Sequence, residues 1–119
     1  MARKMRIGIA TYEDFKQYTK AIARGDVKPK SDAPTIWFES IESMAQVLSS
    51  KNQELLKTIR DNDPKSLTEL ADISGRKLSN LSRTLKTMEK YGIVTLKKDN
   101  DRVIKPRVCA SEFSAVFGI

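Results

Sequence analysis

Two short amphipathic segments joined by a glycine constrain the fold of this chain more than any other feature. The first segment begins with Ser66 and Glu69 at the spacing of a capping box and ends at Gly75, which suits the left-handed end of a helix. Its apolar stripe consists of Leu67, Leu70, Ala71 and Ile73. The second segment ends at Gly92 and places four apolar residues on one side of a helix: Leu78, Leu81, Leu85 and Met88. A short helix, a turn containing glycine and a longer helix together predict a helix-turn-helix.

The segments on either side complete the predicted fold. Upstream, Ser40 opens a helix over residues 41–48, and Ser50 with Gln53 forms a capping box for a helix that contains Leu55, Leu56 and Ile59. Downstream, Ile93–Lys98 and Arg102–Lys105 flank the turn-forming run Asp99-Asn100-Asp101, which predicts a β-hairpin. The expected fold class is mainly α with a β-hairpin wing (α+β), a winged helix-turn-helix.

A chain of 119 residues is expected to form one compact domain, with extensions at both ends. Met5–Ala10 alternates like a short strand, and Thr11 caps a helix over Tyr12–Arg24. Residues 25–34 are polar and turn-forming, so residues 1–35 form an N-terminal strand-helix arm and linker. Residues 36–108 form the winged helix-turn-helix DNA-binding domain, in which Trp37 and Phe38 are expected to be core. Residues 109–119 form an apolar tail.

The positive charge is concentrated in one part of the chain. The net charge of the whole chain is +7, and residues 76–108 alone hold ten Lys and Arg against three Asp and Glu, which is also +7. Such a density favours a polyanionic partner, although a solubilising surface is the alternative.

The outward face of the second helix indicates which polyanion this is. It is polar or basic from Arg76 through Met88, and Glu89 in the last turn is the helix's single acid. Ordinary solvated helices carry both signs of charge, so the lack of acids on this face points to an anionic partner. Asn and Arg are residue types that read base edges in the DNA major groove. We therefore expect double-stranded DNA as the partner. The expected contacts are Ser66, Thr68, Arg76, Lys77, Ser79, Asn80, Ser82, Arg83 and Lys86, with Lys97, Lys98 and Arg102 in the wing. RNA is a weaker alternative, because Tyr91 is the only aromatic residue in the basic stretch.

The composition argues against catalysis and metal binding. The chain has no His, a single Cys at Cys109 and no glycine-rich phosphate loop. We expect no enzyme activity, no metal and no cofactor. The apolar run after the N-terminal cations is too short for a signal peptide, and no run could span a bilayer, so we expect a cytoplasmic protein with no membrane partner.

Two resemblances sharpen this expectation. The runs Ser66–Ala71, Ser74–Arg76, Ser79–Leu85 and Tyr91–Val94 resemble the MarR-like winged helix-turn-helix regulators. With Ile36-Trp37-Phe38 before the Ser40 helix, the chain is similar to the small antitoxins and regulators paired with TumE-type toxins (TumA-like). This resemblance implies a bacterial or archaeal, nucleoid-associated homodimer that binds an operator, represses transcription and neutralises a cognate toxin. The long flanking helices of larger MarR-like regulators are missing, so the resemblance does not imply small-molecule sensing.

A protein-interaction module without direct DNA readout is the alternative function. The apolar tail would serve it, with Phe113, Val116 and Phe117 as candidate partner-binding residues. The tail could pair with a second subunit, with a toxin, or with the strand at Met5–Ile9.

Overall fold

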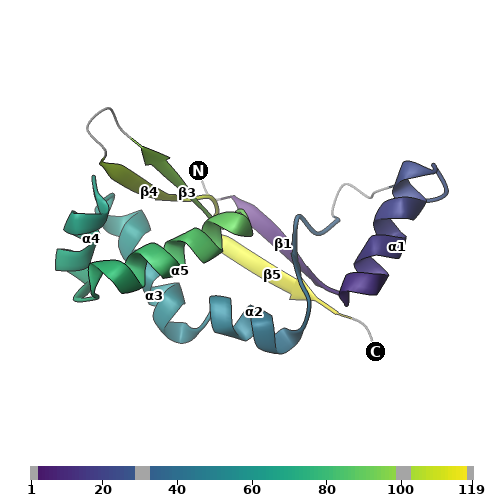
Figure 1. The fold of residues 1–119 in the computed structure, drawn as a ribbon, viewed down its shortest axis with the longest axis horizontal. Coiled ribbons are helices and arrows are strands. Elements are labelled where there is room, and N and C mark those ends of the chain that lie inside the picture. Colours follow the sequence, from purple (N-terminus) through teal and green to yellow (C-terminus); the bar gives the residue numbers. More distant parts are fainter. Residues whose placement is uncertain (1–2, 29–32, 99–102, 118–119) are drawn as a thin grey trace.

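The computed structural model describes residues 3–28, 33–98 and 103–117. Within these ranges the chain forms five helices and five strands. In chain order they are β1 (Lys4–Ile9), α1 (Tyr12–Ala23), β2 (Ile36–Phe38), α2 (Ile41–Val47), α3 (Ser50–Asn62), α4 (Leu67–Ser74), α5 (Leu78–Lys90), β3 (Val94–Lys98), β4 (Ile104–Val108) and β5 (Glu112–Val116). The molecule is elongated, with extents of 49 × 30 × 26 Å (Figure 1).

The predicted winged helix-turn-helix is confirmed. Helix α4 ends at Gly75 in the left-handed conformation (φ 74°), and α5 follows after the turn. Strands β3 and β4 form the antiparallel wing, with Val94 opposite Val108 and Leu96 opposite Pro106. The buried residues of α3, α4, α5 and the start of the wing form one core: Leu55, Leu56, Ile59, Leu67, Leu70, Leu81, Leu85, Met88, Ile93 and Val94. The wing and helices thus share a single packed centre, which fixes the direction in which α5 presents its outer face.

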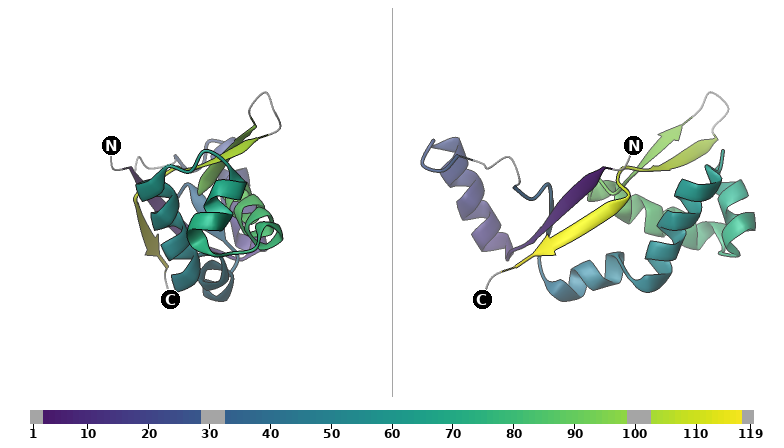
Figure 2. Two further views of the ribbon diagram at one scale, coloured as in Figure 1. Left: turned by 90° about the vertical axis from the view of Figure 1, so that its left-hand side faces the viewer. Right: turned by 180° about the vertical axis from the view of Figure 1, so that it is seen from behind.

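A second, three-stranded sheet joins the two ends of the chain. Its strand order is β2-β1-β5, and both pairings are parallel. In register, Ile7 lies opposite Ile36 on one side and Ala115 on the other, and Ile7 is buried in the common core. Of the three pairings left open for the tail, the structure shows the one with the strand at Met5–Ile9. The N-terminal arm therefore contributes the central strand of a sheet, as Figure 2 shows from behind.

Two helix starts differ from the sequence expectation. The N-cap of α3 is Ser49 rather than Ser50, because the Ser49 hydroxyl accepts a hydrogen bond from the Asn52 backbone N–H at 3.3 Å. Ser66 caps α4 as expected, accepting from the Glu69 N–H at 2.9 Å. The returning half of that box is missing, since the Glu69 carboxylate accepts from the backbone of Lys65 at 3.4 Å instead.

Two residues expected in the helix-turn-helix core are exposed. Leu78 is 48% exposed, because it is the first residue of α5 and lies before the stretch that packs on the core. Ile73 is 43% exposed, because it is two positions after Ala71 and so lies about 200° around the helix from it. The buried stripe of α5 is therefore shorter than the sequence predicts, and its first turn is free at the surface.

Helix α1 stands at the end of the molecule away from the wing (Figures 1 and 2). It has no buried residue, and its contact with the sheet is aromatic: the rings of Phe15 and Tyr18 lie 5.4 and 5.8 Å from that of Trp37. Trp37 is half-buried rather than core, whereas Phe38 is buried and stacks on Tyr91 with ring centroids 4.3 Å apart. The Trp37 indole packs directly against Gly8, and this needs glycine at position 8, because a Cβ on residue 8 would lie 2.6 Å from the ring.

Candidate nucleic-acid interface

The outer face of α5 is polar, basic and accessible. Leu81, Leu85 and Met88 are fully buried, which turns the opposite face of the helix to solvent. On the helix, the predicted contact residues Ser79, Asn80, Arg83 and Lys86 are exposed and Ser82 is half-buried; Lys77, the N-cap residue, is also exposed. A row of amide, hydroxyl and guanidinium groups on one helix has the geometry needed to reach base edges and phosphates.

The one acidic residue of α5 lies away from this row. Glu89 is in the last turn, and its carboxylate accepts a hydrogen bond from the backbone N–H of Leu96 at 3.3 Å. That bond joins the end of α5 to strand β3 of the wing. The acid thus has a structural partner, and the first three turns of α5 present no negative side chain.

Arg76 is placed differently from the other predicted contacts. It is half-buried, and its guanidinium donates to the Asn52 side-chain oxygen at 3.1 Å and to the Lys51 carbonyl at 2.7 Å. Asn52 in turn donates to the Val47 carbonyl at 3.0 Å. These bonds link the turn before α5 to the junction of α2 and α3, so two of the five N–H donors of Arg76 are used inside the chain.

The predicted contacts in α4 also differ from one another. The Ser66 hydroxyl is half-buried and caps the helix, whereas Thr68 is exposed on its first turn. Thr68 is therefore free to meet a ligand, while Ser66 already has an intramolecular partner.

The wing adds cations on both of its faces. Lys97 and Lys98 are exposed on β3, but neighbouring residues of a strand point to opposite sides, so the two lysines do not act on one surface. Lys97 pairs in register with Lys105 and shares its face with exposed Arg107, a cation that the sequence prediction left out. The alternation of Lys105 and Arg107 along β4 was the available signal. Lys105 also contacts Asp63 at 3.5 Å. Arg102 lies outside the described residues.

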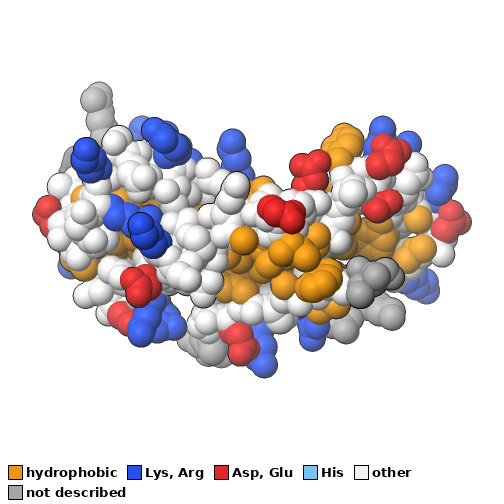
Figure 3. Space-filling model, turned by 90° about the horizontal axis from the view of Figure 1, so that it is seen from below, with side chains coloured by type: hydrophobic (Ala, Val, Ile, Leu, Met, Phe, Trp, Pro, Cys, Tyr) orange, Lys and Arg blue, Asp and Glu red, His pale blue; other side chains and the backbone are white. Residues whose placement is uncertain are grey.

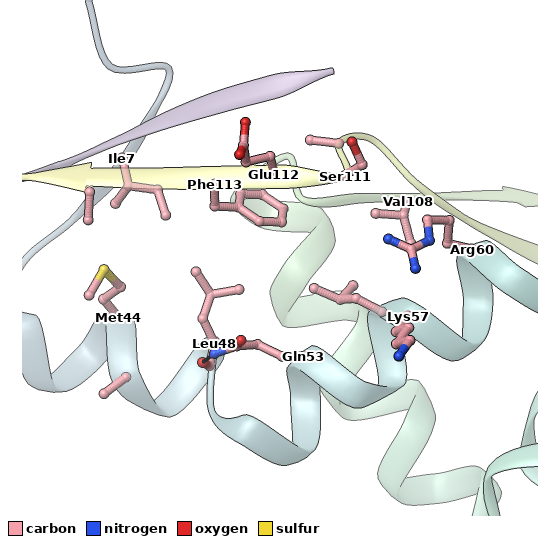
Figure 4. A pocket seen from close by; sticks show the side chains of 14 residues that line it. Ile7, Met44, Leu48, Gln53, Lys57, Arg60, Val108, Ser111, Glu112 and Phe113 are labelled. Carbon is pink, nitrogen blue, oxygen red and sulfur yellow. Dashed lines mark hydrogen bonds between the residues drawn. The ribbon is translucent and has the colours of Figure 1, made fainter. Parts of the chain in front are cut away.

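The three candidate residues of the tail fall on two faces of the sheet. Phe113 points with Ile7 toward Met44 and Leu48, into a groove of about 580 Å³ between the sheet and helices α2 and α3 (Figure 4). Val116 and Phe117 line a second groove of about 420 Å³ with Trp37, Tyr18 and Val27. Figure 3 shows apolar side chains gathered in the middle of the face seen from below. The three residues therefore do not form a single partner-binding surface.

Within residues 3–28, 33–98 and 103–117, no group of three or more His, Cys, Asp and Glu is placed so that it could hold a metal ion. In the same ranges, no helix has the length and apolar character needed to cross a membrane.

Comparison with known proteins identifies the family. A model of the HVO_A0114 protein family matches residues 47–115, which is more than half of the chain. The chain belongs to the HVO_A0114 family. The matched region starts at the last residue of α2, contains α3, α4, α5 and the β3–β4 wing, and ends within β5. The finer resemblance to MarR-like and TumA-like proteins stays a prediction.

Other comparisons add little to this assignment. Among solved structures, a protein described as a predicted DNA-binding transcriptional regulator from E. coli is similar, with a TM-score of 0.48 and 18% sequence identity over 80% of this chain and 84% of the other. A similarity this low does not transfer a function. The comparison with curated proteins found no match for this family member.

Proposed function

We propose that this chain is a sequence-specific DNA-binding transcriptional regulator that acts as a repressor in the cytoplasm. One observation carries the proposal: the exposed face of α5 holds Asn80, Arg83 and Lys86 and no acid until Glu89. In helix-turn-helix proteins the second helix enters the major groove, with its N-terminal residues toward the base edges. Asn80 and Arg83 are one turn apart, which fits readout of adjacent base pairs by the two side chains.

The wing supports the same orientation. Glu89 fixes the end of α5 to β3 through the Leu96 N–H, so the hairpin is held beside the helix. Its exposed cations Lys97 and Arg107, which share one face, would contact phosphates flanking the groove. Phosphate contacts set affinity and register, while the helix supplies specificity.

The test is titration of a selected operator by electrophoretic mobility shift or fluorescence anisotropy. Asn80→Ala and Arg83→Ala should each weaken specific binding by ~1–3 kcal/mol if the side chain reads a base. Binding to unrelated duplexes should change less. Arg24→Ala is the matched control, because Arg24 is an exposed arginine at the C-terminal end of α1, away from α5 and the wing, and its side chain forms a surface ion pair with Asp26. Unchanged operator affinity in both Asn80 and Arg83 variants would refute the proposed readout.

The finer role that we propose is that of an autoregulating antitoxin, a homodimer that represses its own operon and neutralises a cognate toxin. Its support is the similarity of Ile36–Phe38 and the helix-turn-helix to the antitoxins paired with TumE-type toxins. Co-expression with the product of the adjacent gene tests it. The antitoxin role predicts growth arrest by that product alone, rescue by this chain, and a complex that co-purifies. A harmless neighbour would leave a stand-alone repressor.

The proposed role contains no catalytic step. A nuclease assay with and without a chelator tests this part directly. DNA cleavage that a chelator abolishes would contradict it.

A further inference from the structure

The edge strand β5 has one side without a described partner. It pairs with β1 along one edge, and no described residue pairs with the other. An open edge presents unpaired N–H and C=O groups, which natural proteins usually protect with lysines, prolines or bulges. Strand β5 reads Glu-Phe-Ser-Ala-Val and has neither Lys nor Pro. Its one charge, Glu112, forms an ion pair with Lys4 of β1 at 3.3 Å.

Exposed apolar side chains lie at the end of the same strand. Val116 is 63% exposed and Phe117 is 57% exposed. They line the 420 Å³ groove together with Trp37 and Val27, of which Val27 is also exposed. The groove is also lined by β1 and β2, so these apolar side chains lie over the sheet at the C-terminal end of β5. Exposed apolar groups gathered in this way are typical of an interaction site.

We propose that two copies of this chain associate by antiparallel pairing of their β5 edges, about a two-fold axis at Ser114. The three-stranded sheet would then continue across both copies as a six-stranded sheet. This inference deepens the proposed function, because it assigns the interface of the proposed homodimer. It excludes the sheet edge as the place where a partner of another kind pairs.

The residue pattern of β5 is self-complementary in this register. Identical strands related by a two-fold axis must run antiparallel, and centring the axis on Ser114 uses all five residues. Glu112 then lies opposite Val116 of the other copy, so the two carboxylates are not opposed. Phe113 lies opposite Ala115, a large side chain against a small one on the face that α2 and α3 cover. The two Ser114 hydroxyls meet at the axis, where they can hydrogen-bond.

The same register places both winged helices on one side of the joint sheet. Residues directly opposite each other in an antiparallel pair point to the same face. Phe113 and Ala115 point toward helices α2 and α3 in each copy, so both copies carry these helices on the same side. Two recognition helices on one side of a two-fold assembly can address a two-fold symmetric operator.

A charge exchange at Ser114 tests the interface without DNA. Ser114 is exposed, so each single copy should tolerate Ser114→Lys or Ser114→Glu. Either variant opposes like charges at the axis and should raise the dimer dissociation constant by roughly tenfold or more. An equimolar mixture opposes Lys to Glu and should recover the wild-type dissociation constant. The readout is sedimentation equilibrium, with circular dichroism to confirm that each variant is folded. Gln46→Lys on exposed α2 is the control for adding the same charge elsewhere.

Cross-linking tests the register independently. In a Cys109→Ser background, Ser114→Cys places the introduced thiol opposite itself and should give a disulfide-linked dimer on mild oxidation. Glu112→Cys is opposite Val116 in the proposed register and should cross-link far less.

Each outcome has a defined meaning. Recovery in the mixture together with selective cross-linking at position 114 supports the interface. A monomeric wild type, dimers that persist in both charged variants, a mixture that stays monomeric, or stronger cross-linking at position 112 would overturn it. Because no duplex is present, these results leave the DNA-binding proposal to its own test.

Discussion

Replacing Arg76 should reduce the free energy of unfolding, whereas replacing Arg83, the arginine within α5, should leave it nearly unchanged. Arg76→Ala removes two hydrogen bonds, to the Asn52 side chain at 3.1 Å and to the Lys51 carbonyl at 2.7 Å. A net hydrogen bond contributes ~0.5–1.5 kcal/mol. The charge of the donor raises this value, but partial exposure of the site lowers it, so we expect a loss of about 1–2 kcal/mol in the free energy of unfolding. The Arg83 side chain is exposed, and Arg83→Ala should stay within ~0.5 kcal/mol of the wild-type free energy of unfolding.

Urea denaturation followed by Trp37 fluorescence measures the free energy of unfolding, and operator titration of the folded fraction measures binding. A double-mutant cycle with Asn52→Ala isolates the contact, and its coupling energy should be at least ~0.5 kcal/mol. Arg76→Lys should recover only part of the loss, because an ammonium cannot reproduce the two-pronged donor. The reasoning fails if Arg76→Ala leaves stability unchanged and abolishes operator binding, since Arg76 would then be a DNA ligand rather than a link between helices.

Two further perturbations follow from the packing. Gly8→Ala should destabilise the chain by ~1–3 kcal/mol and alter the Trp37 emission, because the new Cβ meets the indole ring at 2.6 Å; unchanged fluorescence and stability would contradict that approach. Leu85→Ala, at a fully buried site, should lower the free energy of unfolding by ~2–5 kcal/mol, whereas Leu78→Ala should change it by less than ~0.5 kcal/mol. Leu78 can also be tested as a contact to a thymine methyl group. In that case Leu78→Ala should weaken binding to the thymine-containing operator more than binding to the same operator with uracil in place of thymine. Equal losses on both duplexes would exclude that contact.

The helix-turn-helix could be read from the sequence because its signals are local. Capping side chains, a glycine at the end of α4 and a repeat of Leu81, Leu85 and Met88 depend on residues at most a few positions apart. Errors arose where a signal was ambiguous by one position. Ser50 with Gln53 has the capping-box spacing, but the adjacent Ser49 is also a favoured N-cap residue type, and it makes the capping hydrogen bond.

The parallel sheet could not be derived with the same certainty, because it joins distant parts of the chain. Strand β1 begins near residue 4 and pairs with β5 more than 100 residues later, and no local pattern encodes that register. The placement of Arg76 was hidden for a similar reason. Its partners Lys51 and Asn52 are 25 and 24 positions away, so the sequence shows an arginine before a recognition helix and nothing of its bonds. The spacing of three and four residues between apolar positions did predict the exposed face of α5, since that face depends only on the helical period.

The two surfaces of this molecule have opposite requirements, and the elongated shape keeps them apart. Cations that bind phosphate need hydration and mobility when free, and burying them against an apolar partner would carry a large desolvation cost. Val116 and Phe117 line a groove with Tyr18 of α1. In this molecule, which is 49 Å long, α1 lies at one end, whereas α4, α5 and the wing occupy the other half (Figure 1). The three-stranded sheet connects the two regions, because Ile7 of β1 packs in the core of the helices and the C-terminal end of β5 reaches the groove beside α1. A two-fold axis through β5 would therefore fix the separation of two α5 helices through a hydrogen-bonded sheet, and footprints on the operator should show half-sites whose spacing is about 34 Å or a multiple of it. Half-sites that tolerate insertions of half a helical turn would indicate that no rigid sheet connects the two copies.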